Sequence, residues 1–247
     1  MGARDWTITE AGNRILDPFT PLKLDQLGGA LGMVRGASML DLACGKGEAL
    51  CQWARAYGIT GFGVDVHPPF VAAARERAQE LGVSAQPDFV ESDASGYIAD
   101  APVDIAACMG GSWIAGGPLG TAELLARSLK PGGIVLIGEP FWREVPTAEE
   151  AITGSGAESV DDFSTLWGLI EAFRSAGWDL VEMVLSDEDS WDRYVATQWL
   201  SIRRFIDASP EDELVPELRA RLDEEPLRYA RYQRRHLGWG VFGLMER

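Results

Sequence analysis

Short apolar segments alternate with helical stretches between residues 38 and 140, and this alternation constrains the fold more than any other feature. Five apolar runs predict strands, at 38–43, 61–66, 89–93, 103–108 and 134–139, and three helices are predicted between them, at 48–57, 70–81 and 121–129. The runs are short and apolar rather than alternating, which is typical of parallel strands buried on both faces. The order predicts an α/β fold, a parallel sheet with helices on both faces.

The regular alternation of strands and helices ends after residue 139. A polar connection leads to a helix at 163–176 and a sixth strand at 180–185, and two helices, at 189–207 and 211–235, precede a last strand at 241–245. A helical insertion just before the final strand is where a lid over a ligand site would lie. We therefore expect a single domain with an N-terminal helical segment (1–36), a ligand-binding core (37–186), a helical lid (187–238) and a last strand (239–247).

The charge of the chain limits its partners. Lysine and arginine number 22 against 38 aspartates and glutamates, for a net charge of −16, which repels a phosphate backbone and argues against nucleic acid as a partner. No apolar run approaches the roughly 20 residues that cross a bilayer. The first ten residues carry charges and do not read as a secretory signal. We expect a cytoplasmic protein without a membrane partner, and the oligomeric state is left open.

Metal and disulfide chemistry have little support. The cysteines are Cys44, Cys51 and Cys108, an odd number without metal-ligand spacing, and only two histidines accompany them. We expect small buried cysteines and no metal site.

Three sequence elements converge on one candidate ligand site, because ligands of open parallel sheets bind beyond the carboxyl ends of the strands. Gly45 and Gly47 follow the first strand and allow a sharp turn and close approach of a ligand. Asp65 ends the second strand and is suited to accept hydrogen bonds from ribose hydroxyls. Asp93 ends the third predicted strand, where its carboxylate could bind an adenine amino group beside the backbone N–H of Ala94.

A glycine-rich turn followed by a ribose-binding acid is also found at NAD sites. The dinucleotide fingerprint needs a third small residue for close helix packing, and Leu50 stands at that position. Glu48 would also place a negative charge near a pyrophosphate. S-adenosylmethionine carries adenine, ribose, a sulfonium and an amino acid but no phosphate, and it is the cofactor we expect. A nucleotide-linked oxidoreductase of Rossmann type and a non-catalytic module that binds the cofactor remain alternatives.

Residues 40–47 read Leu-Asp-Leu-Ala-Cys-Gly-Lys-Gly and resemble the first motif of the class I S-adenosylmethionine-dependent methyltransferases. Asp65, Asp93 and the turn at 129–133 resemble later motifs of that family in order and spacing, so the resemblance covers about 40–140. Ala43 stands where the family usually has its first glycine, and we expect a slightly different fit around the methionine moiety. The outer segments resemble a poorly characterised bacterial subgroup that suggests no substrate.

The resemblance implies a Rossmann-like, seven-stranded, mostly parallel sheet whose last strand runs antiparallel between the fifth and sixth. It implies one methyltransferase domain that passes a methyl group to a small molecule, although a protein acceptor is a further alternative. Asp41 is expected to orient the loop or to meet the ammonium group of the cofactor. The residues expected at the cofactor are Asp41, Ala43, Cys44, Gly45, Gly47, Asp65, Val66, Asp93, Ala94 and Met109.

Methyl transfer from a sulfonium requires a base only when the acceptor atom carries a proton. Glu139 is the first candidate, because the fifth strand should end near the transferred methyl, and His236 on the predicted lid is the second. Structural roles are the alternative for both.

Aromatic residues gather where an acceptor would bind. Trp113 and Trp142 follow the fourth and fifth strands, and Trp191 and Tyr194 lie in the insertion. These four are the candidates to line the acceptor pocket, and core packing is the alternative for all of them, most of all for the two helix residues. Aromatic rings on an acidic protein favour an amine or an uncharged small molecule as acceptor.

Overall fold

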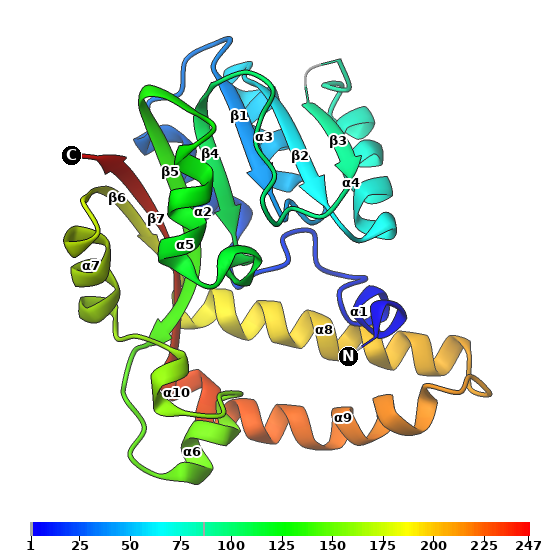
Figure 1. Cartoon of the computed structure of the whole chain (residues 1–247). Coiled ribbons are helices and arrows are strands. Elements are labelled where there is room, and N and C mark those ends of the chain that lie inside the picture. The colour runs from blue at the N-terminus through cyan, green and yellow to red at the C-terminus, as the bar shows by residue number, and fades with distance from the viewer. Residues whose placement is uncertain (1, 86) are drawn as a thin grey trace. The chain divides into compact units, whose positions relative to one another are not determined.

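Seven strands form one sheet in the order β3-β2-β1-β4-β5-β7-β6 (Figure 1). The strands are β1 (Ser38–Leu42), β2 (Thr60–Asp65), β3 (Pro87–Glu91), β4 (Val103–Met109), β5 (Leu129–Trp142), β6 (Trp178–Leu185) and β7 (Leu237–Glu246). The pairs β3–β2, β2–β1, β1–β4 and β4–β5 are parallel, and β6–β7 is antiparallel. The predicted Rossmann-like sheet, with its last strand antiparallel and between the fifth and sixth, is confirmed.

The computed structural model describes residues 2–85 and 87–247, which divide into two compact units. The sheet unit consists of Phe19–Glu139, Ile170–Leu185 and Gly240–Arg247. The helical unit consists of the described residues up to Pro18, together with Pro140–Leu169 and Ser186–Trp239. The single domain with four successive segments stays a prediction, and each unit is described here by itself.

Helices cover both faces of the sheet unit. They are α2 (Pro21–Ala30), α3 (Glu48–Tyr57), α4 (Pro68–Glu80) and α5 (Pro118–Ala126), and α7 (Leu166–Ser175) begins in the helical unit and ends in the sheet unit. In Figure 1, α5 lies in front of the sheet, whereas α2 and α3 lie behind it. Helices α2, α4 and α5 each carry proline in their first turn, where the missing N–H costs no intrahelical hydrogen bond.

Helix α3 packs closely on β2 because the strand, not the helix, supplies the small residue. Leu50 is fully buried, and a Cβ atom at Gly61 would lie 2.2 Å from its Cδ2. At Gly63 a Cβ would lie 2.6 Å from the Phe89 ring. Dinucleotide-binding folds place the small residue on the helix instead.

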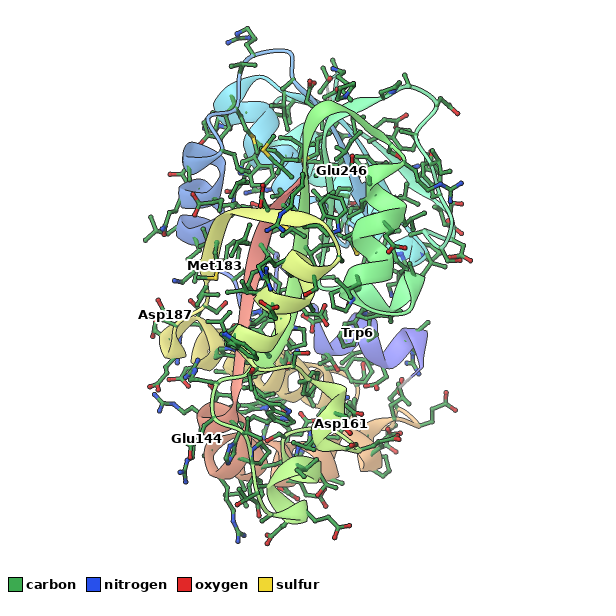
Figure 2. The ribbon with its side chains drawn as sticks, turned by 60° about the vertical axis from the view of Figure 1, so that its left-hand side comes forward. Trp6, Glu144, Asp161, Met183, Asp187 and Glu246 are labelled. Atoms are coloured by element: carbon green, nitrogen blue, oxygen red, sulfur yellow. The ribbon has the colours of Figure 1, made fainter. Side chains whose placement is uncertain are left out.

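The helical unit is built from three stretches of chain. Its elements are α1 (Ala3–Thr9), α6 (Glu149–Gly154), α8 (Glu188–Ala208), α9 (Val215–Arg228), a π-helical turn (Tyr229–Gln233) and α10 (Arg234–His236). Asp187, labelled in Figure 2, caps α8 by accepting a hydrogen bond from the backbone N–H of Ser190. Ile8, Ile202, Ile206 and Leu218 form an apolar core that joins α1 to α8 and α9.

Several element boundaries differ from the sequence prediction. Strand β3 ends at Glu91, so Asp93 lies in the following loop rather than at the strand end. The predicted turn at 129–133 is the beginning of β5, where Leu129 already pairs with Val103 of β4. Strand β7 is longer than predicted because it pairs with β6 from Gly240 to Glu246. Apolar patterns mark the buried part of a strand, whereas backbone pairing extends beyond it.

No helix in the described ranges is long and apolar enough to cross a membrane.

Candidate functional site

The loop between β1 and α3 contains three residues in the left-handed backbone region. Ala43 has φ +55°, Gly45 φ +54° and Gly47 φ +66°. Gly47 is the N-cap of α3, and a Cβ there would lie 2.5 Å from the Phe89 ring and 2.8 Å from the Cβ of Ala74. Only glycine fits position 47, whereas Ala43 holds a conformation that costs an L-residue about 1 kcal/mol.

Asp65 links this loop to the end of β2. One carboxylate oxygen accepts the backbone N–H of Gly45 at 2.8 Å, and the other accepts the backbone N–H of His67 at 2.8 Å. Each oxygen keeps a further lone pair, so the buried carboxylate can hold the loop and still accept a ligand hydroxyl. The sequence indicated the second role but not the first.

Asp41 lies on β1 and is only 2% exposed. Burial, and then the negative charge of Asp65, raise the pKa of Asp41 to about 8. The carboxyl is therefore mostly protonated at neutral pH, and a cationic ligand group beside it would favour its ionised form. This chemistry suits an ammonium group.

Asp93 already has local partners. Its two oxygens accept the backbone N–H and the hydroxyl of Ser95, each at 2.8 Å, and these bonds lower its pKa. The exposed carboxylate thus organises the loop after β3, as a capping residue does. The loop places Ala94 in a buried position and Tyr97 in a stacked arrangement with Phe62, at a ring-centroid distance of 6.0 Å.

Loops after β1 and β4 also meet. A Cβ atom at Gly111 would lie 2.6 Å from the Cβ of Ala43, so the two backbones approach closely. Met109, which ends β4 just before Gly110 and Gly111, is half-buried.

Burial raises the pKa of the Cys44 thiol well above its usual value, which keeps it protonated and unreactive. Val66 is 70% exposed after β2.

Glu139 is the acid at the carboxyl end of β5 in the sheet unit. One carboxylate oxygen, Oε2, is buried and has no hydrogen-bond partner among the described residues, while the hydroxyl of Ser112 is hydrogen-bonded to the carboxylate. Burial raises the pKa of Glu139 to about 7, opposed by the Ser112 hydrogen bond. Sequence reasoning missed Ser112, because nothing local distinguishes a serine after a strand.

The two strand-end tryptophans have opposite environments. Trp113 is 74% exposed in the short helix Ser112–Ala115 of the sheet unit. Trp142 is 2% exposed, donates its indole N–H to the carbonyl of Val160 at 2.8 Å and packs edge-on against Phe163 at 5.1 Å. Trp142 thus has the position of a core residue of the helical unit, which agrees with core packing better than with pocket lining.

The remaining predicted residues lie in the helical unit. Trp191 packs against the cluster around Trp142, and its buried indole nitrogen has no partner in the described part of the chain. The Tyr194 hydroxyl lies 2.9 Å from a carboxylate oxygen of Glu10 and 2.9 Å from the carbonyl of Leu16. His236 is buried, with Nδ1 2.7 Å from the carbonyl of Glu144. Tyr194 and His236 therefore have structural partners.

Glu48 at the start of α3 is neutralised by a partner on α4. Arg77 donates two hydrogen bonds of 2.8 Å to its carboxylate, and Gln52 donates a third of 2.7 Å. The charge of Glu48 is therefore a weaker obstacle to a pyrophosphate than the sequence suggested. Leu50 departs from the dinucleotide fingerprint, and its contact with Gly61 means that the strand supplies the small residue in place of the helix.

The described residues contain no group of three or more histidines, cysteines, aspartates and glutamates arranged to hold a metal ion.

Comparison with known proteins shows which family the chain resembles. A family model described as a methyltransferase domain matches residues 39–133. An uncharacterised protein of Escherichia coli K12, YjhP, is 52% identical over 244 residues, which are 99% of this chain and 98% of that protein.

Solved structures agree. Crystal structures of S-adenosylmethionine-dependent methyltransferases from Geobacter sulfurreducens and Thiobacillus denitrificans, each in complex with S-adenosylhomocysteine, are 54% identical to this chain. Both match with a TM-score of 0.97 over 99% of this chain and 98% of theirs. The [4+2]-cyclase SpnF, at 20% identity and a TM-score of 0.68, shares the fold alone.

Proposed function

The chain belongs to the family of S-adenosylmethionine-dependent methyltransferases, and from this premise we propose that it transfers the methyl group to a small-molecule acceptor. The observation that carries the proposal is the loop after β1, which is tied through Gly45 to the buried carboxylate of Asp65. Two relatives that are 54% identical over nearly the whole chain are described as complexes with S-adenosylhomocysteine.

The residues after the first three strands fit the parts of this cofactor. Asp65 would accept hydrogen bonds from the ribose hydroxyls, and Asp41, buried and mostly protonated, would ionise beside the ammonium of the amino-acid end. Asp93 and Ala94 would bind the adenine. Gly47, where a Cβ would meet Phe89, lets this loop pack against β3. When bound, the cofactor supplies an electrophilic methyl group.

The protein has two tasks in such a reaction: to hold the acceptor in line with the methyl and to exclude water. Trp113 presents an exposed ring immediately after Ser112, on the loop whose Gly111 meets Ala43. We assign this ring to the acceptor side of the site. The net charge of −16 favours an amine or an uncharged compound over an anion.

Removal of the Asp65 carboxylate tests the cofactor assignment. Asp65→Ala should weaken S-adenosylhomocysteine binding about ten- to a hundredfold, since hydrogen bonds to a charged group contribute about 1.5–3 kcal/mol. Calorimetry measures the affinity. Asp25→Ala removes the same charge from an exposed position on α2 and should leave binding unchanged. Equal affinities for Asp65→Ala and the wild type would contradict the ribose assignment.

The acceptor class needs a separate experiment. Purified enzyme is incubated with methyl-labelled S-adenosylmethionine and an extract of Escherichia coli, an organism with a 52% identical relative. We expect label in the small-molecule fraction. Label confined to the protein fraction would refute a small-molecule acceptor while leaving methyl transfer intact.

A further inference from the structure

We propose that Glu139 is the catalytic base of this enzyme and that Oε2 takes a proton from the nitrogen or oxygen atom that receives the methyl group. The inference rests on the proposed methyl transfer and narrows its acceptor to amines and hydroxyl compounds. Position, hydrogen bonding and charge environment support it independently.

The first argument is position. Gly138 of β5 is in register with Met109 of β4, and the N–H of Gly110 donates to the carbonyl of Gly138 at 3.2 Å. Glu139 therefore stands beside the loop that follows β4, and the Ser112 hydroxyl bonds to it. Gly111 of that loop meets Ala43, which belongs to the loop assigned to the cofactor. The loop that follows β4 thus lies between Glu139 and the loop assigned to the cofactor.

The second argument is the unused oxygen. Oε2 is buried without a partner in the described part of the chain, an arrangement that costs free energy when the carboxylate is ionised. A donor from a bound molecule would stabilise the ionised carboxylate. An N–H or O–H group of a bound acceptor would supply one, whereas a carboxylate acceptor would add a second negative charge.

The third argument is the environment. Burial raises the pKa of Glu139 to about 7, and the Ser112 hydrogen bond is the opposing influence. The titratable groups on the adjoining strands are Asp104 and Cys108 on β4, Lys130 on β5 and Glu246 on β7. Asp104 and Lys130 pair with each other near the start of their strands, away from Glu139. A base whose pKa lies near the working pH transfers protons most effectively.

The step balances in atoms and electrons. The acceptor's lone pair forms a bond to the methyl carbon, and the carbon–sulfur bond breaks with its electron pair moving to sulfur. The sulfonium becomes the neutral thioether of S-adenosylhomocysteine. The proton of the acceptor atom moves to Oε2, which converts Glu139 to a carboxylic acid. Acceptors without a proton on the nucleophilic atom would gain nothing from this group.

The test repeats the labelled-methyl assay with the Escherichia coli extract between pH 5.5 and 9, using wild type, Glu139→Gln, Ser112→Ala and Glu123→Gln. Glu123 is exposed on α5 and provides the matched control for the loss of one carboxylate. Calorimetric S-adenosylhomocysteine affinity and thermal unfolding are measured for every variant, which separates loss of chemistry from loss of folding or cofactor.

In the wild type, label transfer should rise with pH through about 7 and then level off, as Glu139 ionises. Glu139→Gln should lower the rate of label transfer about a hundredfold or more. Its rate should no longer rise with pH through 7, and its cofactor affinity should stay within twofold of the wild type. In Ser112→Ala the rise of the rate should occur at higher pH, because the hydrogen bond that favours the carboxylate is gone. Glu123→Gln should match the wild type.

Three results would overturn the assignment. A Glu139→Gln enzyme with the same rate of label transfer and the same pH dependence as the wild type would show that no proton passes to Glu139. A tenfold loss of S-adenosylhomocysteine affinity would place Glu139 in cofactor binding instead. Label found only in carboxylic acids or thioethers would exclude the acceptor class. If the wild type labels nothing while still binding S-adenosylhomocysteine, the proposed function itself fails.

Discussion

At the residue scale, the acids at the ends of the first two strands have different tasks. Asp65 accepts a backbone N–H on each of its oxygens, one from Gly45 and one from His67, and so holds two loops together. Asp41 is buried close enough to Asp65 that like charge adds to burial in raising its pKa to about 8. A cationic ligand group beside Asp41 would favour the ionised form of this carboxyl.

We expect Asp41 to make cofactor binding depend on pH. S-adenosylhomocysteine, which carries an ammonium, should release about one proton on binding at pH 7, because the bound cation lowers a pKa that is about 8 in the free protein. Affinity should therefore rise with pH and level off above 8. Calorimetry in buffers of different ionisation enthalpy measures the release.

Two controls isolate this group. Adenosine lacks the ammonium and should release no proton through Asp41, and Asp41→Asn should abolish the release. Equal proton release with both ligands would rule out the ammonium contact.

In the free protein, the raised pKa of Asp41 means that stability is lost as the pH rises toward 8. Asp41→Asn should therefore unfold at a higher temperature than the wild type at pH 8.

At the element scale, the N-terminus of α3 is held by α4. Glu48, in the first turn of α3, is buried and receives two hydrogen bonds from Arg77 of α4. The carboxylate also lies at the positive end of the α3 dipole. This ion pair therefore fixes the end of the helix next to the cofactor loop.

Breaking that pair should be costly. Arg77→Met removes the guanidinium that pairs with the buried Glu48 carboxylate and should lower the free energy of unfolding by about 2–4 kcal/mol. Arg174→Met breaks an exposed pair with Glu171 within α7 and should cost about 0.5 kcal/mol or less. Urea unfolding of both variants measures the difference, and equal losses would mean that the α3–α4 pair contributes no more than a surface pair.

At the scale of the whole molecule, each compact unit is assembled from three separate stretches of chain. In the helical unit, Asp5 of α1 pairs with Arg221 of α9, and Glu10 accepts hydrogen bonds from Tyr194 and Gln198 of α8. The segment before Pro18 is therefore part of the same unit as the helices that precede the last strand.

The lid itself stays a prediction from the order of elements along the chain. If it is correct, saturating S-adenosylhomocysteine should slow amide exchange in Glu188–Ala208 as well as around Gly45. Mass spectrometry of exchanged peptides measures both. The Asp65→Ala protein at the same ligand concentration is the control, and its exchange should change little. Unaltered exchange in Glu188–Ala208 of the saturated wild type would argue against a lid.

The sequence by itself determined the strands of the parallel sheet and the glycine loop after the first of them, because these depend on local signals. Continuous apolar runs mark buried parallel strands, and Gly47 is required by one backbone conformation. The family motif at 40–47 and the acid at 65 also lie within a short stretch of chain. Strand limits were less predictable, because the pairing of Leu129 with Val103 depends on a neighbouring strand.

Only the tertiary structure decided which side chains are available for chemistry. Trp142 and Trp113 both follow strands, yet one is buried and the other exposed. Glu139 meets Ser112, and Tyr194 meets Glu10 from 184 residues away. Burial and hydrogen-bond partners such as these are set by contacts between distant segments, which leave no periodicity in the sequence. The same contacts set the pKa of a carboxyl group, and so its capacity to act as a base.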